Sequence, residues 1–466
     1  METKQRDFIS KEEASSPTVS TESVLLTCII DAQEGRDVAV VDIPNAFIQM
    51  RVKSKKDRVI IRVRGVLADM LVDIAPTQYK KYLTKDKKGN SLLLLECLNA
   101  IYGTMVTSLL YYGKFCETLK KHGFELNPYD PCVANRMVNK KQQTVCWHVD
   151  DLKLSHADAS ANDNFIKALK SEYESIFEDG SGKMKVSRGK IHKYLGMTLD
   201  YSIKGQCKIT MLDYIEETLK MFEKVAPKDS GTKSSAAPKD LFITNDKCYK
   251  LEPDMKETFH LLVAKILFAT KRARPDTGTA ISFLTTRVRE PDKDDWRKLV
   301  HLMKYLRGTK DMPLILSANG SGVLKWHVDG SYTVHPNMRG HTGGGLTMGQ
   351  GCPISTSTKQ KLNTRSSTES ELVAVDDLMP SILWTRQFLE AQDYNVQENI
   401  ILQDNKSAIL LEKNGKASSS KRTKHISVQY FFVTDMVRKD RVSIDWCPTD
   451  DMIAKSTPIQ GTREPG

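Results

Sequence analysis

Short apolar runs and helix-like stretches alternate in the first part of the chain. The stretch 21–32 has the pattern of a helix and is followed by an apolar run at 38–41. Residues 143–156 have the pattern of two short strands around a Val-Asp-Asp turn. Residues 105–123 and 161–177 are predicted to be helices, the second of them amphipathic. Strands and helices are therefore expected to be mixed in this part of the chain.

The pattern changes at 226–240, where proline, serine, alanine and lysine dominate and a linker is expected. Helical spacing returns over about 254–308, and a second mixed unit begins near Val323. Its expected elements are a strand (323–328), a glycine-rich hairpin (343–356), a helix from Ser367, a strand (399–403), a short helix (405–413) and a last strand (442–446). The triplet Gly343-Gly344-Gly345 is predicted to form the turn of that hairpin, because no strand-to-helix G-x-G-x-x-G pattern surrounds it.

Length and composition fit a protein made of several ordinary globular units. The 466 residues suggest about three domains, and 40% of the residues are hydrophobic. The nine cysteines include no C-x-x-C pair, so neither a zinc site nor a disulfide framework is indicated. The N-terminus lacks the apolar segment of a secretion signal, and no run reaches the ~20 apolar residues that span a membrane. We expect a cytoplasmic (particle-associated) or nuclear protein that is not secreted and has no membrane partner.

The chain is basic, with 69 Lys and Arg residues against 58 Asp and Glu residues and a formal net charge of +11. Such a surface attracts polyanions, including nucleic acids. A well-solvated basic face explains the same charge. Basic residues gather at 51–64, 183–193 and 421–424, where phosphate contacts would hold a nucleic acid without reading its sequence.

Three aspartates of the first part lie next to predicted strands. Asp42 follows the apolar run, and Asp150 and Asp151 lie at the tip of the predicted hairpin. Converging carboxylates repel one another unless cations neutralise them. Two Mg²⁺ ions about 4 Å apart would do so and would serve an in-line phosphoryl transfer. Other Asp-Asp pairs occur at 294–295, 376–377 and 450–451. The pair alone therefore does not distinguish a catalytic site from a solvated turn.

Motifs around these aspartates resemble those of copia-type reverse transcriptases. They are Val41-Asp42-Ile43-Pro44-Asn45-Ala46-Phe47 (D-x-x-x-A-F), Tyr102-Gly103 with Tyr111-Tyr112 (Y-G…W-Y), His148-Val149-Asp150-Asp151 (Y-V-D-D) and Tyr194-Leu195-Gly196-Met197 (F-L-G-[MI]). Their order and spacing agree with the family. In two respects the chain departs from it: His148 replaces the usual tyrosine, and residues 103–110 lack the usual Gln or Lys.

The resemblance implies that Asp42, Asp150 and Asp151 hold two Mg²⁺ ions for nucleotidyl transfer. It also implies that Phe47 and Val149 lie at the incoming nucleotide, where an aromatic ring would exclude a 2′-hydroxyl. Without the motif, Phe47 would be taken for a core residue. The family has a basic fingers segment before its first aspartate. The basic residues among the first 37 here are Lys4, Arg6, Lys11 and Arg36. We therefore expect the fingers to be missing or incomplete.

A second set of carboxylates is spread over the last third of the chain. Asp329 ends the predicted strand 323–328, Glu369 lies near the start of a predicted helix, and Asp404 ends a later strand. Two strand ends and one helix start can meet in a mixed sheet and hold two Mg²⁺ ions that direct a water at a phosphodiester. Each residue also has a structural alternative. Glu369 would favour the helix dipole, and Asp404 would cap the next helix.

Motifs around this second set resemble those of copia-type ribonuclease H. They are Lys359-Gln360-Lys361 (K-Q-K), Ser366-Ser367-Thr368-Glu369-Ser370-Glu371 (S-S-T-E-A-E), Asp404-Asn405-Lys406-Ser407-Ala408 (D-N-x-S-A) and Arg422-Thr423-Lys424-His425-Ile426 (R-T-K-H-I). The resemblance implies that Asp329, Glu369 and Asp404 hold two Mg²⁺ ions and that this unit cleaves the RNA of an RNA–DNA hybrid. The family continues with Ala-Asp where this chain has Ala454-Lys455. The fourth carboxylate is therefore absent, and we expect a weak or inactive nuclease.

Taken with the resemblance, the sequence predicts an α/β and α+β protein in three parts. They are a reverse transcriptase palm with an antiparallel sheet and helices (1–225), a helical thumb- or connection-like part (226–318) and a ribonuclease-H-like mixed-sheet domain (319–466). The expected function is RNA-directed DNA polymerase with ribonuclease H, acting on an RNA template, a DNA primer, an RNA–DNA hybrid and deoxynucleoside triphosphates. Two alternatives stay open: a decayed retroelement remnant that only binds nucleic acid, and an integration-type nuclease, which also uses three carboxylates.

Overall fold

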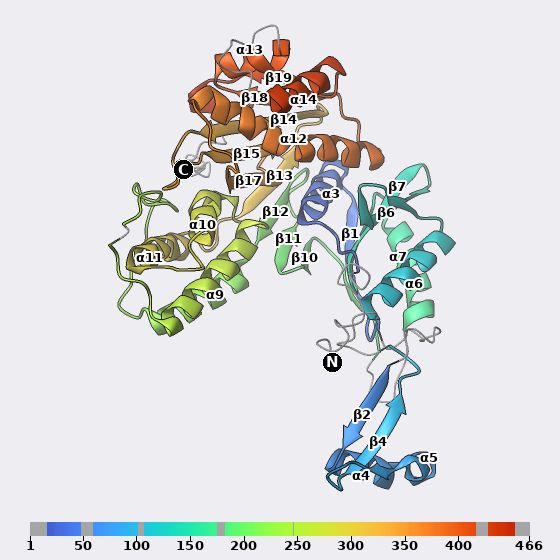
Figure 1. The fold of residues 1–466 in the computed structure, drawn as a ribbon. Helices are drawn as coiled ribbons and strands as arrows, with labels where there is room; N and C mark the ends of the chain where they lie inside the picture. The colour runs from blue at the N-terminus through green and yellow to red at the C-terminus, as the bar shows by residue number, and fades with distance from the viewer. Residues whose placement is uncertain are drawn as a thin grey trace.

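The computed structural model describes residues 16–47, 59–100, 107–174, 182–245, 247–415 and 427–452. These residues form four β-sheets with helices packed around them, a mixed α/β architecture (Figure 1). The basic stretch at 421–424, the Tyr102-Gly103 pair and the Ala454-Lys455 pair lie outside the described residues. None of the described helices is both long enough and apolar enough to cross a bilayer.

Helix α3 (Thr21–Glu34) and strand β1 (Asp37–Asp42) form the centre of the first unit. The Ser20 side chain caps α3 by accepting a hydrogen bond from the N–H of Ser23, and the helix ends at Gly35 in the left-handed conformation. Strand β1 lies between β8 and β9 in an antiparallel six-stranded sheet of order β5-β6-β7-β8-β1-β9. The four central residues of β1 are all buried, which explains why this segment reads as an apolar run rather than an alternating strand.

Among the other elements of this unit, β7, β8, α6 and α7 agree with the sequence prediction to within a few residues, whereas β5, β6 and β9 were not predicted. The strands are β5 (Glu125–Asn127), β6 (Asp130–Val138), β7 (Lys141–His148), β8 (Asp151–His156) and β9 (Lys185–Ser187); the helices are α6 (Thr107–Lys121) and α7 (Ala159–Tyr173). Helix α6 buries Tyr111, Phe115 and Leu119 at four-residue spacing. The two helices predicted from their pattern are therefore confirmed.

A small unit between β1 and α6 projects away from the rest of the molecule (Figure 1). It contains β2 (Ile60–Arg64), α4 (Val66–Ile74), α5 (Pro76–Tyr79), η2 (Lys80–Tyr82), β3 (Thr84–Lys85) and β4 (Ser91–Glu96), with a sheet of order β2-β4-β3. Only β2 coincides with a predicted strand, 51–64, whose residues 51–58 lie outside the described part. The rest of this unit was not anticipated.

The middle of the chain is largely helical. Its elements are β10 (Ile191–Tyr194), β11 (Met197–Asp200), β12 (Cys207–Thr210), α8 (Leu212–Val225), α9 (Pro253–Thr270), η3 (Pro275–Thr277), α10 (Gly278–Thr285), α11 (Lys293–Gly308) and β13 (Leu314–Ala318). The predicted linker 226–240 has no helix or strand, yet it is held on α11, where Arg307 donates to the carbonyls of Asp229 (3.1 Å) and Gly231 (3.0 Å). It is a packed connection rather than a loose tether.

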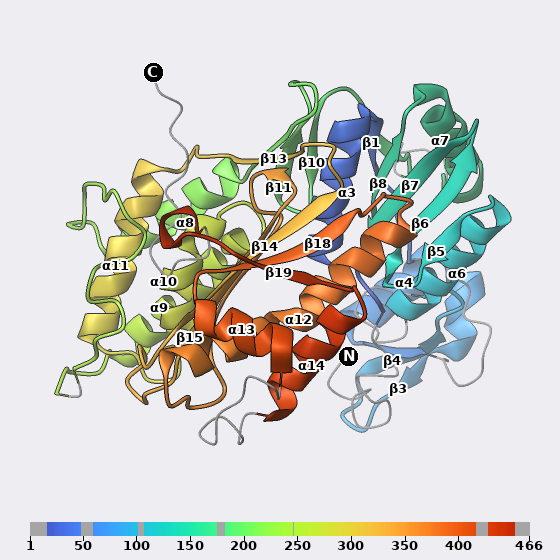
Figure 2. The same ribbon diagram turned by 90° about the horizontal axis from the view of Figure 1, so that it is seen from above.

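The last unit is built on a mixed sheet of order β17-β15-β14-β18-β19. Its strands are β14 (Val323–Ser331), β15 (His341–Thr347), β17 (Ile354–Lys359), β18 (Glu398–Gln403) and β19 (Ser443–Trp446). Strands β14, β18 and β19 are parallel neighbours, whereas β15 and β17 run antiparallel. Helices α12 (Ser367–Ala391), α13 (Lys406–Asn414) and α14 (Ser427–Arg438) contact one another beside this sheet (Figure 2). The short η6 (Thr449–Asp451) ends the described chain.

The glycine triplet corrects one sequence prediction. Gly343, Gly344 and Gly345 lie inside strand β15, not in a turn, and all three are buried. A Cβ on Gly344 would stand 2.2 Å from Leu378 Cδ1 of α12. The glycines therefore allow the helix to approach the strand closely. The chain reverses later, through β16 (Gly349–Gln350), where Gln350 pairs with Ser317 of β13 and joins the last unit to the sheet of the middle part.

Candidate active sites

The first three predicted carboxylates gather at one end of strands β1 and β8. Asp42 and Asp151 are direct cross-strand partners, because β1 and β8 pair in antiparallel register. Asp150, directly before Asp151, lies in the adjoining turn, where its backbone carbonyl accepts a hydrogen bond from the N–H of Ile43 (3.1 Å). Lys185 of β9 places its Nζ 3.7 Å from Asp42 Oδ2. Segments about a hundred residues apart in the chain thus contribute to one acidic edge.

The turn that carries Asp150 is tight and strained. His148 and Asp151 pair across it, which leaves Val149 and Asp150 as its two central residues. Val149 has a φ of 60°, a left-handed conformation that a β-branched residue rarely adopts. Such strain persists where the surrounding structure fixes the backbone, and it is often found at functional sites.

Negative charge accumulates at this edge. Burial raises the pKa of Asp150, and the charge of Asp42 raises it further. Burial also raises the pKa of Asp151, with additional contributions from Asp150 and Asp42, while His148 lowers both values. A bound cation would relieve this repulsion. Phe47, five residues after Asp42, packs on the hydrophobic core, with its ring edge-to-face against Tyr111 at a centroid distance of 5.9 Å.

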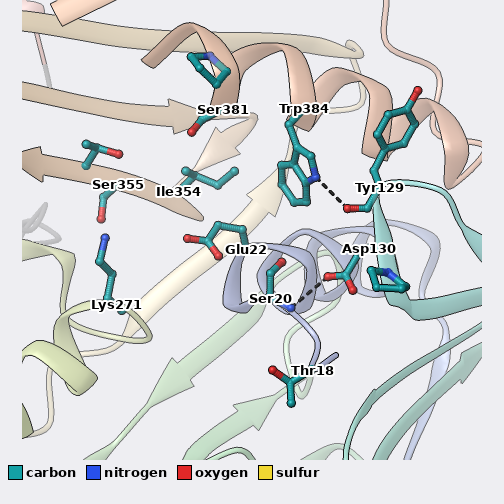
Figure 3. A pocket seen from close by; sticks show the side chains of 13 residues that line it. Thr18, Ser20, Glu22, Tyr129, Asp130, Lys271, Ile354, Ser355, Ser381 and Trp384 are labelled. Atoms are coloured by element: carbon teal, nitrogen blue, oxygen red, sulfur yellow. Dashed lines mark hydrogen bonds between the residues drawn. The ribbon is translucent and has the colours of Figure 1, made fainter. Parts of the chain in front are cut away.

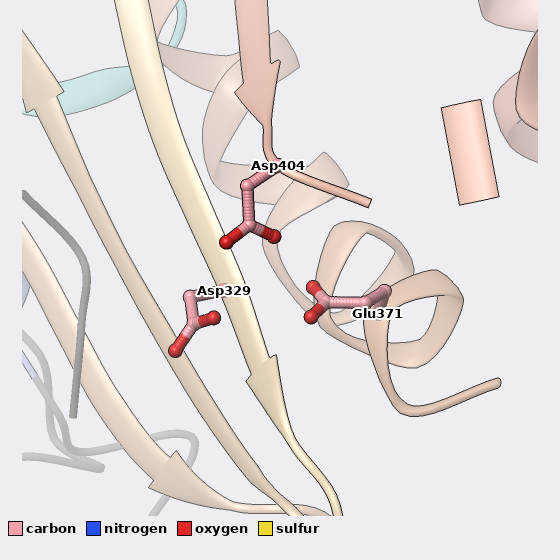
Figure 4. Close-up of side chains that lie close together, drawn as sticks. All are labelled: Asp329, Glu371 and Asp404. Atoms are coloured by element: carbon pink, nitrogen blue, oxygen red, sulfur yellow. The ribbon is translucent and has the colours of Figure 1, made fainter. Parts of the chain in front are cut away.

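The second carboxylate group is more compact. Asp329 on β14, Asp404 directly after β18 and Glu371 on α12 present ligand atoms that all lie within 4.8 Å of one another. Figure 4 shows the three side chains pointing toward a common centre. Because β14 and β18 are parallel neighbours, their ends bring Asp329 and Asp404 together. Among the described residues, no other three His, Cys, Asp or Glu side chains are grouped in this way, so the carboxylates of Asp42, Asp150 and Asp151 share one sheet edge without coming together as closely.

Glu371 takes the place that the sequence interpretation gave to Glu369. Glu369 turns back to the start of α12, where its Oε2 accepts a hydrogen bond from the N–H of Arg365 (2.6 Å). The Ser366 side chain in turn accepts from the N–H of Glu369 (3.2 Å), so the two residues stabilise the helix end. Residues two apart on a helix differ by about 200° in direction. Only one of the two glutamates can therefore face the sheet.

The sequence did contain a signal for this choice. Glu371 lies on the same helical stripe as Val375, Leu378 and Ile382, all of which are buried. Glu369 shares its stripe with the buried Val373 but also with Asp376 and Pro380, which are not buried. The helical phase therefore favours Glu371 as the glutamate on the more continuous apolar stripe.

Asp404 does not cap the following helix, as one alternative had it. The cap of α13 is Asn405, whose side chain accepts hydrogen bonds from the N–H groups of Ser407 and Ala408 (both 3.1 Å). Burial raises the pKa of Glu371 to about 9, and the charges of Asp329 and Asp404 contribute further. A carboxyl with this pKa would hold a proton at neutral pH, the expected behaviour of crowded, buried carboxyl groups.

A cavity of about 590 Å³ lies where the first, middle and last units meet (Figure 3). Lys271, Tyr129 and Ser355 are among its lining residues, and the indole N–H of Trp384 donates to the carbonyl of Tyr129 (3.0 Å) across it. None of the predicted site carboxylates lines it. The cavity lies at the junction between the last unit and the first, and it is separate from both acidic groups.

The homologues of this chain are Pol polyproteins of copia/Ty1-type retrotransposons, at modest identity. The chain is 23% identical over 465 residues to the "Retrovirus-related Pol polyprotein from transposon TNT 1-94" of Nicotiana tabacum, covering 97% of the chain and 32% of that polyprotein. It is 23% identical over 452 residues to the corresponding polyprotein from transposon RE2 of Arabidopsis thaliana, covering 97% of the chain and 28% of that polyprotein. The chain thus spans a third or less of these two relatives.

A shorter relative and the solved structures complete the comparison. The putative transposon Ty5-1 protein of Saccharomyces cerevisiae is 25% identical over 291 residues, which cover 62% of this chain and 89% of that protein. No protein-family profile matches the chain. Prototype foamy virus protease–reverse transcriptase superposes over 95% of this chain and 47% of its own with 13% identity and a TM-score of 0.23, which is too low to support an argument.

Proposed function

We propose that the chain is the reverse transcriptase and ribonuclease H region of a copia-type retrotransposon polyprotein. The observation that carries this proposal is the convergence of two acidic groups from distant segments, each at the ends of neighbouring strands. The similarity to Pol polyproteins over 97% of the chain supports the same conclusion. The order of the motifs around both groups, which resembles that of copia-type elements, supports it further.

In the first site, Asp42, Asp150 and Asp151 would hold two Mg²⁺ ions. Their fit to such ions rests on carboxylate oxygens alone at a crowded edge, the donor set that Mg²⁺ prefers. Bound Mg²⁺ would supply charge stabilisation for the reacting phosphates. In the proposed reaction, the primer 3′-hydroxyl attacks the α-phosphate of a deoxynucleoside triphosphate, and pyrophosphate leaves. Phe47 and Val149 would contact the nucleotide, with the Phe47 ring excluding a 2′-hydroxyl.

In the second site, Asp329, Glu371 and Asp404 would hold two Mg²⁺ ions for hydrolysis of the RNA strand of a hybrid. Glu371 replaces Glu369 in this role because it is the glutamate whose carboxylate faces the two aspartates. Water would attack the phosphodiester, leaving a 5′-phosphate and a 3′-hydroxyl. We keep the expectation of a weak nuclease, since Lys455 follows Ala454 where the family has its fourth carboxylate.

The proposed partners are an RNA template, a DNA primer and the hybrid they form. The net charge of +11 favours such polyanions, and the basic stretch 183–193 contains Lys185, which lies beside Asp42. If these residues contact phosphates, affinity falls steeply as salt rises. An affinity that is insensitive to salt would argue against this surface.

Primer extension on poly(rA)·oligo(dT) with Mg²⁺ tests the proposal most simply. The folded chain is expected to extend the primer, and Asp150→Asn is expected to abolish extension while leaving hybrid binding intact. A folded chain that binds the hybrid without extending it would instead favour the remnant that only binds nucleic acid. Cleavage or joining of DNA ends without extension would favour the integration-type nuclease.

A further inference from the structure

A carboxyl group and a carboxamide near the second carboxylate group are both fully buried. Gln403 is the last residue of β18, directly before Asp404, and Glu412 lies on α13. Both residues are 0% exposed. Both side-chain oxygens of Glu412 and both polar side-chain atoms of Gln403 have no hydrogen-bond partner of normal geometry among the described residues. Gln403 lies near enough to influence the pKa of Glu412, so these four buried polar atoms belong to neighbouring side chains.

These four atoms are chemically complementary when Glu412 carries a proton. Burial raises the pKa of Glu412 to about 8, and the nearby Gln403 carboxamide opposes the shift only in part. A neutral carboxyl offers one O–H donor and one C=O acceptor, and a carboxamide offers the matching C=O and N–H. Two hydrogen bonds would then satisfy all four atoms, whereas leaving them unpaired is destabilising.

We propose that Glu412 and Gln403 form a cyclic acid–amide pair that fixes the end of β18 and so positions Asp404 toward Asp329 and Glu371. The inference rests on the proposed function, because positioning matters only if this carboxylate group binds divalent cations. Glu412 and Gln403 are positioning residues that act through Asp404. Residues of this kind, behind the ligands, typically change metal affinity about 10–100-fold when they are replaced.

The backbone of both residues is anchored by other contacts. The backbone carbonyl of Gln403 accepts from the N–H of Cys447 (2.9 Å), and the backbone carbonyl of Glu412 accepts from the Thr434 hydroxyl (2.8 Å). Leu372, next to Glu371 on α12, packs with Ala408 and Leu411 of α13. Helix α13 therefore connects the elements that carry Glu371 and Asp404. A charged Glu412 would also add to the repulsion, since its charge raises the pKa of Glu371.

Mn²⁺ binding, followed by electron paramagnetic resonance, tests the positioning role without requiring activity. The full chain carries Asp150→Asn and Asp151→Asn, so that the first site does not contribute. Glu412→Leu is expected to weaken Mn²⁺ binding about 10-fold or more. Glu412→Gln is expected to leave it unchanged, because two carboxamides can form the same cyclic pair. Glu398→Gln, at the exposed start of β18, is the matched control and is expected to have no effect.

The double substitution Gln403→Leu with Glu412→Leu separates positioning from simple stability. Replacing both polar groups by apolar ones is expected to restore the thermal midpoint but not the Mn²⁺ affinity. Recovery of both would overturn the positioning role, and so would unchanged binding in Glu412→Leu. A parent chain that binds no Mn²⁺ would contradict the proposed nuclease site and this role with it.

Infrared spectroscopy tests the pair itself, independently of any metal. At pH 6, the difference spectrum between the parent chain and Glu412→Gln is expected to show the loss of a neutral carboxyl C=O band. Loss of carboxylate bands instead would mean that Glu412 is ionised, and the acid–amide pair would be refuted.

Discussion

The backbone N–H of Gly330 donates to Glu371 Oε2 at 2.8 Å. Gly330 directly follows Asp329, so this one hydrogen bond ties the carboxylate of the helix to the strand that carries Asp329. It also lowers the pKa of Glu371 against the larger upward effect of burial. The contact explains how a buried glutamate is held facing two aspartates.

Exchanging the two glutamates of α12 for glutamine one at a time tests which of them is a ligand. Glu371→Gln is expected to weaken Mn²⁺ binding at the second site at least 10-fold, because a ligand charge is lost. Glu369→Gln is expected to leave binding unchanged, since its amide oxygen can still accept from the N–H of Arg365. Equal losses of Mn²⁺ binding in both variants, or a larger loss in Glu369→Gln, would favour the sequence prediction that Glu369 belongs to the site.

The pH dependence of stability should report Glu371 when no divalent cation is present. Its folded pKa of about 9 lies above the ordinary glutamate value of 4.5, so its stabilising contribution is fully present below pH 4.5 and is lost as pH rises toward 9. The slope for one proton is at most about 1.4 kcal/mol per pH unit. Urea titrations should show that Glu371→Gln gains stability relative to the parent across this range. A constant difference between the two proteins would mean that Glu371 is ionised throughout.

Gly330 and Gly113 make a matched pair for glycine-to-alanine substitution. A Cβ on Gly330 would lie 2.4 Å from the carbonyl oxygen of Ser370, whereas a Cβ on Gly113 of α6 meets nothing within 4 Å. Gly330→Ala is expected to cost about 1–3 kcal/mol because backbone must move. Gly113→Ala is expected to stabilise α6 by up to about 1 kcal/mol. Chemical denaturation measures both, and a neutral Gly330→Ala would show that α12 is less tightly docked than described.

A buried ion pair supports the sheet of the first site. Lys153 of β8 pairs with Asp31 of α3, and both side chains are almost fully buried. Burial alone lowers the pKa of Lys153, but Asp31 and two neighbouring thiols more than offset this, so the net shift is upward. Asp31→Asn is expected to cost about 3–5 kcal/mol by leaving the ammonium unpaired. Lys153→Met added to it should recover part of the loss, and a purely additive double variant would contradict the pairing.

The strand ends that carry aspartates were predictable from the sequence. The apolar runs before Asp42 and Asp404 mark strands with buried central residues, and the run before Asp329 marks a strand that is buried or half-buried except at Lys325. Pairing at the Val149-Asp150 turn follows from the hairpin pattern. The approximate limits of these strands could be predicted for the same reason, because burial determines which positions must be apolar.

What the sequence did not reveal depends on packing between distant segments. The choice of Glu371 over Glu369 depends on which side of α12 faces the sheet. The position of the glycine triplet inside a strand depends on how closely Leu378 of α12 approaches β15. The unit formed by 59–96 has short, partly exposed strands whose pattern is weak. The domain limits at 225 and 318 stay predictions.

A crosswise substitution experiment tests most directly whether the chain holds two separate divalent-ion sites. Asp151→Asn and Asp404→Asn are each assayed for primer extension and for Mn²⁺ binding at the second site, the latter in the absence of nucleic acid. Asp151→Asn should abolish extension and keep second-site binding, while Asp404→Asn should weaken that binding and keep extension. If either substitution removed both properties, or if Asp151→Asn extended primers normally, two independent sites would be contradicted.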